Sequence, residues 1–423
     1  MNKYKLTTLK NGLRVVTVPV KGHQTIAVSI FAQAGSDYES KSENGLSHFL
    51  EHMFFKGTIR RPKPIDVSRE FDSIGAINNA STWNYMTAYY AKASKKHFTK
   101  ILDVISDMYL NSSLPQREIE KERGVISGEI DMYNDNPMYI VQDLHTELLY
   151  GDQPAGRMIL GPKENIRKFN REDFLKYREK HYIGIKTILV VSGDLRHSEV
   201  VKEAKKIFSD LKKGKDIKQE KTKINQKKQK IAVKKRKTEQ SHLILSFHTP
   251  NQEDKDTHVL RVLNALFGKH MSSRLTQRIR EELGLGYYVR SYYSTSYDRG
   301  LLEVDMGVDN KRAVEAVEAL LEECRRIRKE KVSPAELKIA KRHLSGVRAL
   351  QLESTDSLAN FYGAQFSSRL KRILSPRELK LKQDKVTAED ILRVAKKTFR
   401  NSNMNLAVVG PHSKAKFQKI FRL

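Results

Sequence analysis

The feature that most constrains the fold is a passage that occurs twice in the chain. The segment REDFLKYREKHYIGIKTILVVSGDL begins at Arg171 and AEDILRVAKKTFRNSNMNLAVVGPH begins at Ala388, and the two align without a gap. Each copy has the pattern of a helix followed by a buried strand, and each precedes a further amphipathic helix that ends in Lys-Ile-Phe. A repeat of this kind predicts one structural unit used twice.

Each half also has strand patterns near its start, at residues 25–35 and 241–250, followed by long helical periodicity such as that of residues 97–110. We therefore predict an α+β fold with two homologous halves related by internal duplication, each a mainly antiparallel sheet packed with helices. Two β-rich runs joined at Asn11-Gly12 predict a hairpin at the N-terminus. The predicted division is a first half at 1–212, a Lys-rich linker at 213–237 and a second half at 238–423.

The composition suits a folded protein with several packed units. The chain has 423 residues, of which 39% are hydrophobic and 30% charged. No apolar run approaches the roughly 20 residues that cross a bilayer, and the N-terminus has no secretory pattern, so we expect a cytoplasmic location. Cys324 is the only cysteine, which excludes an internal disulfide and a site of several cysteine ligands. Any metal must bind histidine and carboxylate side chains.

The net charge of +28 is the main signal for another class of protein. A field of that size favours nucleic acid or other acidic partners. Much of the excess lies between Lys202 and Lys237, where a linker or a solvated surface is the simpler interpretation. A basic nucleic-acid-binding protein stays open as an alternative.

The sequence GLSHFLEHMFFKGT contains a metal-binding pattern. Its apolar residues fall at helical spacing, so His48 and His52 lie one turn apart on the same helix face, with Glu51 beside them. A catalytic zinc needs a third protein ligand from elsewhere and one open position for water. Glu122 and Glu129, seven residues apart in a later helical segment, are both candidates. The alternative is a pair of ordinary surface histidines.

The chain resembles the inverzincin peptidases, also called the pitrilysin or insulinase type. The resemblance spans nearly the whole chain and rests on NGLRVV, GLSHFLEHMFFKGT, NNASTWNYMTAYY, ERGVISGEI, HMSSRLTQRIREELGLGYYV and the repeated LVVSGDL-type strand. It implies one Zn²⁺ per chain held by His48, His52 and Glu129, with Glu51 as the catalytic base. It also implies that Glu122 orients a ligand, although a plain surface carboxylate stays open.

The same resemblance implies residues that hold a peptide substrate. Asn79 and Ala80 would lie on a strand to which substrate adds as a further strand, and the alternative is an ordinary hairpin with Asn in its turn. Arg280 and Tyr287 would grip substrate from the half without metal, and the alternative is a helix-surface Arg and a packed Tyr. Whether Tyr287 or the adjacent Tyr288 has this role stays open. The family often has an acidic residue where this chain has Tyr85.

The length resembles that of short family members, such as the mitochondrial processing peptidase beta subunit and bacterial homodimeric zinc peptidases. This resemblance implies a homodimer that encloses a chamber and cleaves peptides or unfolded segments. The metal half of one subunit would face Arg280 and Tyr287 of the other. A heteromeric partner chain and a non-catalytic peptide-binding subunit stay open as alternatives.

Overall fold

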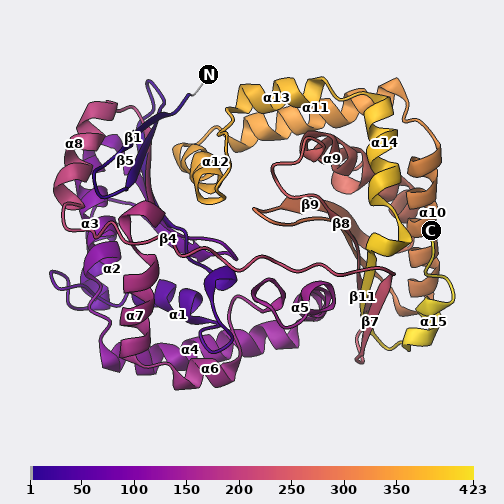
Figure 1. The fold of residues 1–423 in the computed structure, drawn as a ribbon, viewed down its shortest axis with the longest axis horizontal. Coiled ribbons are helices and arrows are strands. Elements are labelled where there is room, and N and C mark those ends of the chain that lie inside the picture. The colour runs from indigo at the N-terminus through magenta and orange to yellow at the C-terminus, as the bar shows by residue number, and fades with distance from the viewer. Residues whose placement is uncertain (1–2) are drawn as a thin grey trace. The chain divides into compact units, whose positions relative to one another are not determined.

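The computed structural model describes residues 3–423 of the chain, which form two compact units. Unit 1 contains the described residues of Met1–Asp131 together with Arg157–Glu220 and Leu350–Ser375. Unit 2 contains Met132–Gly156, Lys221–Ala349 and Pro376–Leu423. Figure 1 labels most of the helices and strands of both units.

Unit 1 is built on a six-stranded sheet in the order β1-β2-β6-β3-β5-β4. Strands β2 and β6 run parallel, and the other neighbouring pairs run antiparallel. The strands are β1 (Lys5–Thr8), β2 (Arg14–Pro19), β3 (Thr25–Ala32), β4 (Ile77–Thr82), β5 (Thr87–Ser94) and β6 (Thr187–Gly193). The expected hairpin is confirmed: Thr8 pairs with Arg14, and Gly12 takes a φ of +86° in the turn. The predicted first half begins at residue 1, and its residues 1 and 2 lie outside the part of the chain that the structure describes.

Helices cover both faces of this sheet. One face packs against α1, α3, α7 and α8 in a core that includes Phe49, Leu102, Phe174 and Val200. The other face packs against α12, which contributes Tyr362 to a second apolar cluster. The helices are α1 (Leu46–Met53), α2 (Pro64–Asp72), α3 (Phe98–Asn111), α4 (Gln116–Asp135), α6 (Lys163–Lys168), α7 (Arg171–His181), α8 (His197–Ile207) and α12 (Thr355–Ser367).

Unit 2 is built on a five-stranded sheet in the order β7-β11-β8-β10-β9. Only β7 and β11 run parallel among its neighbouring pairs. The strands are β7 (Lys230–Lys235), β8 (Gln240–Thr249), β9 (Gly286–Thr295), β10 (Gly300–Asp309) and β11 (Met404–Gly410). The helices are α5 (Pro137–Tyr150), α9 (Thr257–Asn264), α10 (Ala313–Lys329), α11 (Pro334–Gln351), α13 (Pro376–Asp384), α14 (Ala388–Thr398) and α15 (Lys414–Gln418). Helix α11 extends two residues beyond the unit boundary.

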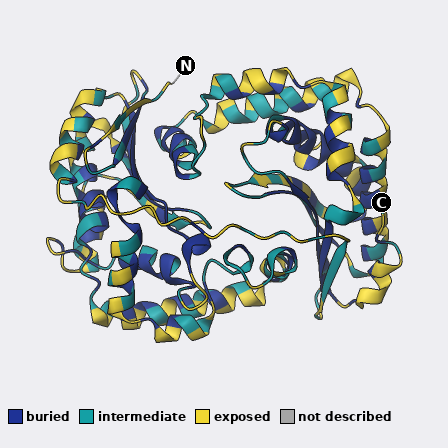
Figure 2. Ribbon diagram, in the orientation of Figure 1, coloured by how far each residue is buried: buried dark blue, intermediate teal, exposed yellow. Residues whose placement is uncertain are grey.

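Five strands of the unit 1 sheet, β2-β6-β3-β5-β4, have the same order and directions as the five strands of the unit 2 sheet, and β1 is an additional edge strand. This correspondence confirms the predicted α+β fold with duplicated halves. In each sheet the strand of the repeated passage, β6 or β11, lies between one parallel and one antiparallel neighbour. The helix of the repeated passage is α7 in one half and α14 in the other. Figure 2 shows the strands as mainly buried and the outer helix faces as exposed in both units. Among the described residues, no helix has the length and apolar character that crossing a bilayer requires.

The units differ from the predicted division in two respects. Residues 213–237 are not only a linker, because β7 lies inside this range and pairs with β11. Ile231 and Val233 pack against the unit 2 core, while the lysines of this edge strand remain at the surface. In addition, α12 belongs to unit 1 and α5 to unit 2, because each packs on the sheet of that unit through apolar side chains.

Candidate metal centre

The local sequence fixes helix α1 so that one of its faces remains available for chemistry. Gly45 precedes the helix with a φ of +103°, a conformation that favours glycine. The buried Glu39 carboxylate accepts hydrogen bonds from the amides of Gly45 (2.9 Å) and Ser47 (2.6 Å), which satisfies donors at the start of the helix. The apolar face packs into the unit 1 core through Leu46, Phe49, Leu50 and Met53.

Three predicted ligands converge between α1 and α4. The Nε2 atoms of His48 and His52 are 3.3 Å apart. Glu129 Oε2 lies 3.6 Å from Nε2 of His48 and 3.8 Å from Nε2 of His52. This is the only group of three or more possible metal ligands found among the described residues. Tetrahedral bonds of about 2.0–2.1 Å place donor atoms about 3.3–3.4 Å apart, so the two nitrogens have the spacing that zinc requires.

Glu122 contacts Nδ1 of His52 and is not part of the group formed by His48, His52 and Glu129. His52 Nδ1 donates to Glu122 Oε1 at 2.8 Å, because an ionised carboxylate can only accept. This bond leaves the Nε2 lone pair of a neutral His52 directed toward His48 and Glu129. Lys56 Nζ contacts the second oxygen of Glu122 at 2.5 Å. The structure therefore separates the two candidate carboxylates by position, with Glu129 beside both Nε2 atoms and Glu122 on the outer nitrogen of one ring.

The electrostatics of the site leave His48 neutral. Burial, together with the adjacent His52, lowers the pKa of His48 to about 3. Burial opposes a charge on His52 as well, but the hydrogen bond to Glu122 and the nearby carboxylates raise its pKa. Burial raises the pKa of Glu51, which moves this carboxyl toward the range in which it can both accept and donate a proton.

The strand β4 lies beside α1 and carries the predicted substrate residues. It is an edge strand whose only partner among the described residues is β5. Thr82, at its end, donates its hydroxyl to Glu51 Oε2 at 2.5 Å. Asn79 is exposed and accepts the amide of Ala80 on its side-chain oxygen, whereas the Ala80 side chain is buried in the core. Tyr85, in the following turn, is partly buried against the cluster under α12.

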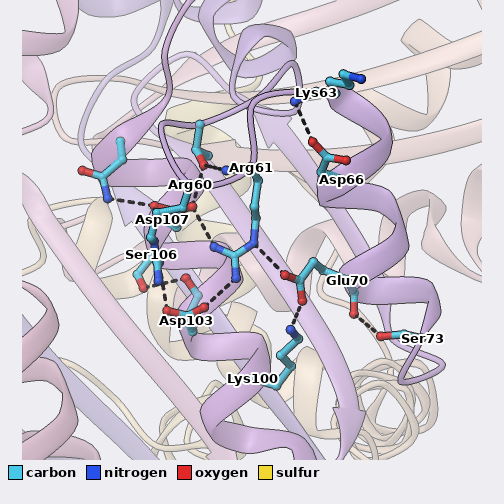
Figure 3. A network of polar contacts seen from close by, with 12 residues as sticks. Arg60, Arg61, Lys63, Asp66, Glu70, Ser73, Lys100, Asp103, Ser106 and Asp107 are labelled. Atoms are coloured by element: carbon cyan, nitrogen blue, oxygen red, sulfur yellow. Dashed lines mark hydrogen bonds and ion pairs between the residues drawn. The ribbon is translucent and has the colours of Figure 1, made fainter.

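The loop that leaves α1 is tied to α3 by a network of ion pairs (Figure 3). Arg61 donates to Asp107 at 2.7 Å, to Asp103 at 2.6 Å and to Glu70 at 3.2 Å. Arg60 donates to Asp103 at 2.8 Å and to Asp107 at 3.1 Å. The side chain of Asp107 has no exposed surface. The network therefore fixes the chain just beyond the histidines.

In unit 2, Arg280 and Tyr287 are both at the surface. Arg280 lies in the π-helical segment Thr276–Glu282, and its Nε is 3.7 Å from Glu281. Tyr287 is 66% exposed at the start of β9. The hydroxyl of Tyr288 instead lies 3.0 Å from His242 Nδ1 inside the sheet. The helix at the corresponding place in this unit, α9, has no His-x-x-Glu-His pattern.

Sequence reasoning did not identify Lys56, Thr82 or Glu39. Lys56 follows His52 by four residues, which is the spacing of one helical turn and was the one local signal available. The contacts of Thr82 and Glu39 with α1 depend on how separate segments pack. Contacts between separate segments leave no recognisable pattern in a single sequence.

Comparison with known proteins decides the family. Residues 14–163 match the family model described as Insulinase (Peptidase family M16), and residues 168–344 match the model described as Peptidase M16 inactive domain. A zinc protease of Rickettsia bellii is 33% identical over 98% of this chain and 99% of its own length. The chain belongs to peptidase family M16.

Other M16 relatives span most of the chain. The zinc protease YmxG of Bacillus subtilis is 35% identical over 84% of this chain and 85% of its own length. The mitochondrial-processing peptidase subunit beta of Mus musculus is 32% identical and covers 96% of this chain and 84% of its own length. A protease from Helicobacter pylori has the same fold, with a TM-score of 0.91, 23% identity, and coverage of 97% of this chain and all of that one. The predicted family resemblance is confirmed.

Proposed function

We propose that the protein is a zinc-dependent endopeptidase in which His48, His52 and Glu129 hold the metal. The observation that carries this proposal is the convergence of two imidazole nitrogens and one carboxylate oxygen within 4.8 Å of one another, with Glu51 on the same helix. The names of the M16 relatives support the same class of reaction.

The donor set fits zinc, which binds histidine nitrogen and carboxylate oxygen in sites with three protein ligands. His48 Nε2, His52 Nε2 and Glu129 Oε2 would hold the ion, one per chain. When bound there, zinc supplies Lewis acidity that polarises the scissile carbonyl and lowers the pKa of a water molecule. An N/O site accepts several divalent ions, so zinc is the expected metal and not the only one that fits.

Glu51 carries out the proton transfers in this proposal. Its carboxylate accepts a proton from the attacking water and then delivers that proton to the nitrogen of the leaving amine. Thr82 holds Oε2 of Glu51, which leaves Oε1 as the oxygen that handles the proton. The raised pKa of Glu51 suits a group that must take up and release a proton in one cycle.

Substrate would bind as an added strand on the free edge of β4. Backbone pairing of this kind gives affinity with little dependence on side chains, so cleavage specificity from this edge is loose. Asn79 would contact the peptide near the scissile bond. Arg280 would donate to substrate carbonyls, and the hydroxyl of Tyr287 would donate to the oxyanion that forms during attack.

We propose a homodimer that encloses a chamber and admits short or unfolded peptides, in a cytoplasmic location. The chain contains the proposed metal ligands and also Arg280 and Tyr287, so two copies of it could form complete sites without a different partner chain. A heteromer is the alternative, because one relative is named as the beta subunit of a processing peptidase.

Cleavage of a quenched fluorescent peptide library tests the proposed activity. Native protein with zinc should cut, while chelator-treated protein and zinc-loaded Glu51→Gln should lose activity by about a thousandfold or more. If zinc-loaded native protein leaves the whole library intact, the proposed endopeptidase activity of the homo-oligomer is wrong.

A further inference from the structure

Two large apolar residues are exposed on the edge strand β4 and in the turn that follows it. Ile77, the first residue of β4, is 67% exposed, and Trp83, directly after the strand, is 40% exposed. An edge strand already has unpaired main-chain groups, and exposed apolar side chains on it add a risk of aggregation. Clustered apolar exposure of this kind marks a surface that a partner covers. Ile77 and Trp83 therefore indicate a binding surface along β4.

The pairing of β4 with β5 puts the two apolar residues on one face of the sheet. The hairpin ladder extends past the end of β4, because the amide of Trp83 donates to the carbonyl of Met86 at 2.8 Å. Side chains at every second position of a strand share a face. Ile77 and Trp83 therefore lie on the same face, and the residues between them on this face are Asn79 and Ser81.

The same ladder decides which main-chain groups face the free edge of β4. In an antiparallel pair, successive residues bond alternately toward the partner strand and away from it. Trp83 bonds toward the partner, so the residues that alternate with it, Asn78, Ala80 and Thr82, direct their N–H and C=O groups to the free edge. The amide of Ala80 agrees with this direction, because it donates to the side-chain oxygen of Asn79 at 2.8 Å. An added peptide strand would pair with these three residues.

The other face of β4 adjoins the proposed active site. Thr82 donates its hydroxyl to Glu51 Oε2, and the Ala80 side chain is buried in the core that packs against α1. A peptide paired with the free edge would therefore have its main chain beside Glu51. Its side chains would alternate between the face of α1 and the face of Ile77 and Trp83.

The positions of the two apolar residues set a spacing on such a peptide. Ile77 and Trp83 are six residues apart, which is about 20 Å along a strand that rises about 3.3 Å per residue. Peptide residues that are also six apart would lie beside both of them, on one face. This spacing is the same whether the peptide runs parallel or antiparallel to β4. The peptide residues between them on that face would lie beside polar side chains.

We propose that Ile77 and Trp83 are specificity-determining residues that select peptides with large apolar side chains six residues apart. The inference rests on the proposed binding of substrate along β4. It adds a side-chain preference to backbone pairing, which by itself discriminates little between sequences. Cross-strand apolar contacts are individually modest, so the two together should favour a matched peptide by about five- to tenfold.

Fluorescence titration tests the proposal, because Trp83 is the only tryptophan of the chain. Zinc-loaded Glu51→Gln is titrated with two capped nine-residue peptides of the same composition, each with two leucines among serines and threonines. Leucines at positions 2 and 8 match the spacing, whereas leucines at positions 2 and 7 fall on opposite faces of a strand. The matched peptide should shift the Trp83 emission to shorter wavelength and bind about five- to tenfold more tightly.

The variants Ile77→Ser and Trp83→Ser, each made in zinc-loaded Glu51→Gln, test the two residues separately. Both residues are exposed, so the substitutions should leave the fold intact. Fluorescence anisotropy of labelled peptides measures binding in all variants. Each variant retains one apolar contact for either peptide, so the two peptides should bind it equally. Ile59→Ser, at a residue of unit 1 that is 79% exposed and lies outside β4, should keep the full preference.

The possible failures are distinguishable. Equal affinity of the two peptides for Glu51→Gln, or an undiminished preference in Ile77→Ser or Trp83→Ser, would overturn the inference and leave the proposed peptidase activity standing. If neither peptide binds, the strand addition on which the inference rests is wrong, and the inference fails with it. Cleavage of the peptide library by native protein decides the peptidase activity separately.

Discussion

A substitution at Lys56 tests how the surroundings of the proposed metal site affect metal binding, because it changes none of the proposed ligands. The Lys56 ammonium contacts Glu122, which in turn accepts the Nδ1 proton of His52. We expect Lys56→Met to weaken zinc binding about tenfold, because Glu122 loses the group that orients it. Lys56→Arg should restore much of the affinity.

Competition with a chromophoric chelator measures this change directly. The matched control is Lys96→Met, which removes an exposed lysine of the same unit away from the ligands. Unchanged zinc affinity in Lys56→Met would mean that Glu122 is held by His52 alone.

The sequence predicted the residues of the site unevenly. His48, Glu51 and His52 form a local pattern, so helical spacing alone puts them on one face. The choice of Glu129 over Glu122 came only from the family resemblance, since both fit the same heptad. Lys56, Thr82 and Glu39 were missed because each acts across a contact between separate segments.

Asp107 anchors the loop beyond the metal helix and should matter for stability. Its unexposed carboxylate accepts from Arg60, Arg61 and Thr58. Asp107→Ala removes a fully buried acceptor from Arg61 and Thr58, although Arg61 keeps Asp103 and Glu70, and should lower the free energy of unfolding by about 1–3 kcal/mol. Urea unfolding measures the loss, and Glu172→Ala, in an exposed pair with Lys176, should change nothing measurable. Equal effects of the two substitutions would contradict the assigned role of the network.

The same carboxylate predicts a pH dependence. Burial opposes its charge, but hydrogen bonds from Thr58, Asn111 and the two arginines outweigh burial and lower the pKa of Asp107. A lowered pKa in the folded state stabilises the protein above the unfolded value of about 3.9, and this contribution is lost as the pH falls below it. The stability difference between native protein and Asp107→Ala should therefore shrink below about pH 4. A difference that stays constant from pH 7 to pH 3 would contradict this explanation.

At the scale of elements, α12 can be tested through a single close contact. Gly363 faces Phe31 of β3, and a Cβ at this position would lie 2.1 Å from a ring carbon. Gly363→Ala should therefore destabilise unit 1 by about 1–3 kcal/mol. Gly346→Ala, in open space on α11, should stabilise that helix by about 0.5–1 kcal/mol.

Hydrogen exchange followed by mass spectrometry separates the two effects. Faster exchange should appear in peptides from α12 for Gly363→Ala and should not appear there for Gly346→Ala. Unchanged protection of α12 in a folded Gly363→Ala would mean that α12 does not depend on this contact with the sheet.

The elements show where sequence patterns reach their limit. Periodicity and the internal repeat predicted the strands β3 and β8, the helix α3 and the repeated helix–strand pairs. The strand β7 was assigned to a linker because lysines dominate it, although Ile231 and Val233 alternate as a half-buried edge strand requires. The assignment of α12 to unit 1 depends on apolar contacts far apart in sequence, which no local pattern records.

At the scale of the whole molecule, the proposed homodimer predicts complementation. If each site combines Glu51 of one subunit with Arg280 of the other, Glu51→Gln and Arg280→Ala should each be inactive alone. Co-refolded mixtures should regain about a quarter of native activity, since about half of the dimers are mixed and each has one intact site. No recovery in a mixture shown to contain mixed dimers would mean that both residues act within one subunit, whereas native activity of Arg280→Ala alone would mean that Arg280 has no such role.

The location of the metal is the most direct test of the central claim. Crystals of zinc-loaded protein should give one anomalous difference peak per chain at the zinc absorption edge, within about 2.0–2.2 Å of His48 Nε2, His52 Nε2 and a Glu129 oxygen. Glu122 should remain on Nδ1 of His52 and outside the coordination sphere. A peak elsewhere, or one coordinated by Glu122 in place of Glu129, would contradict the account.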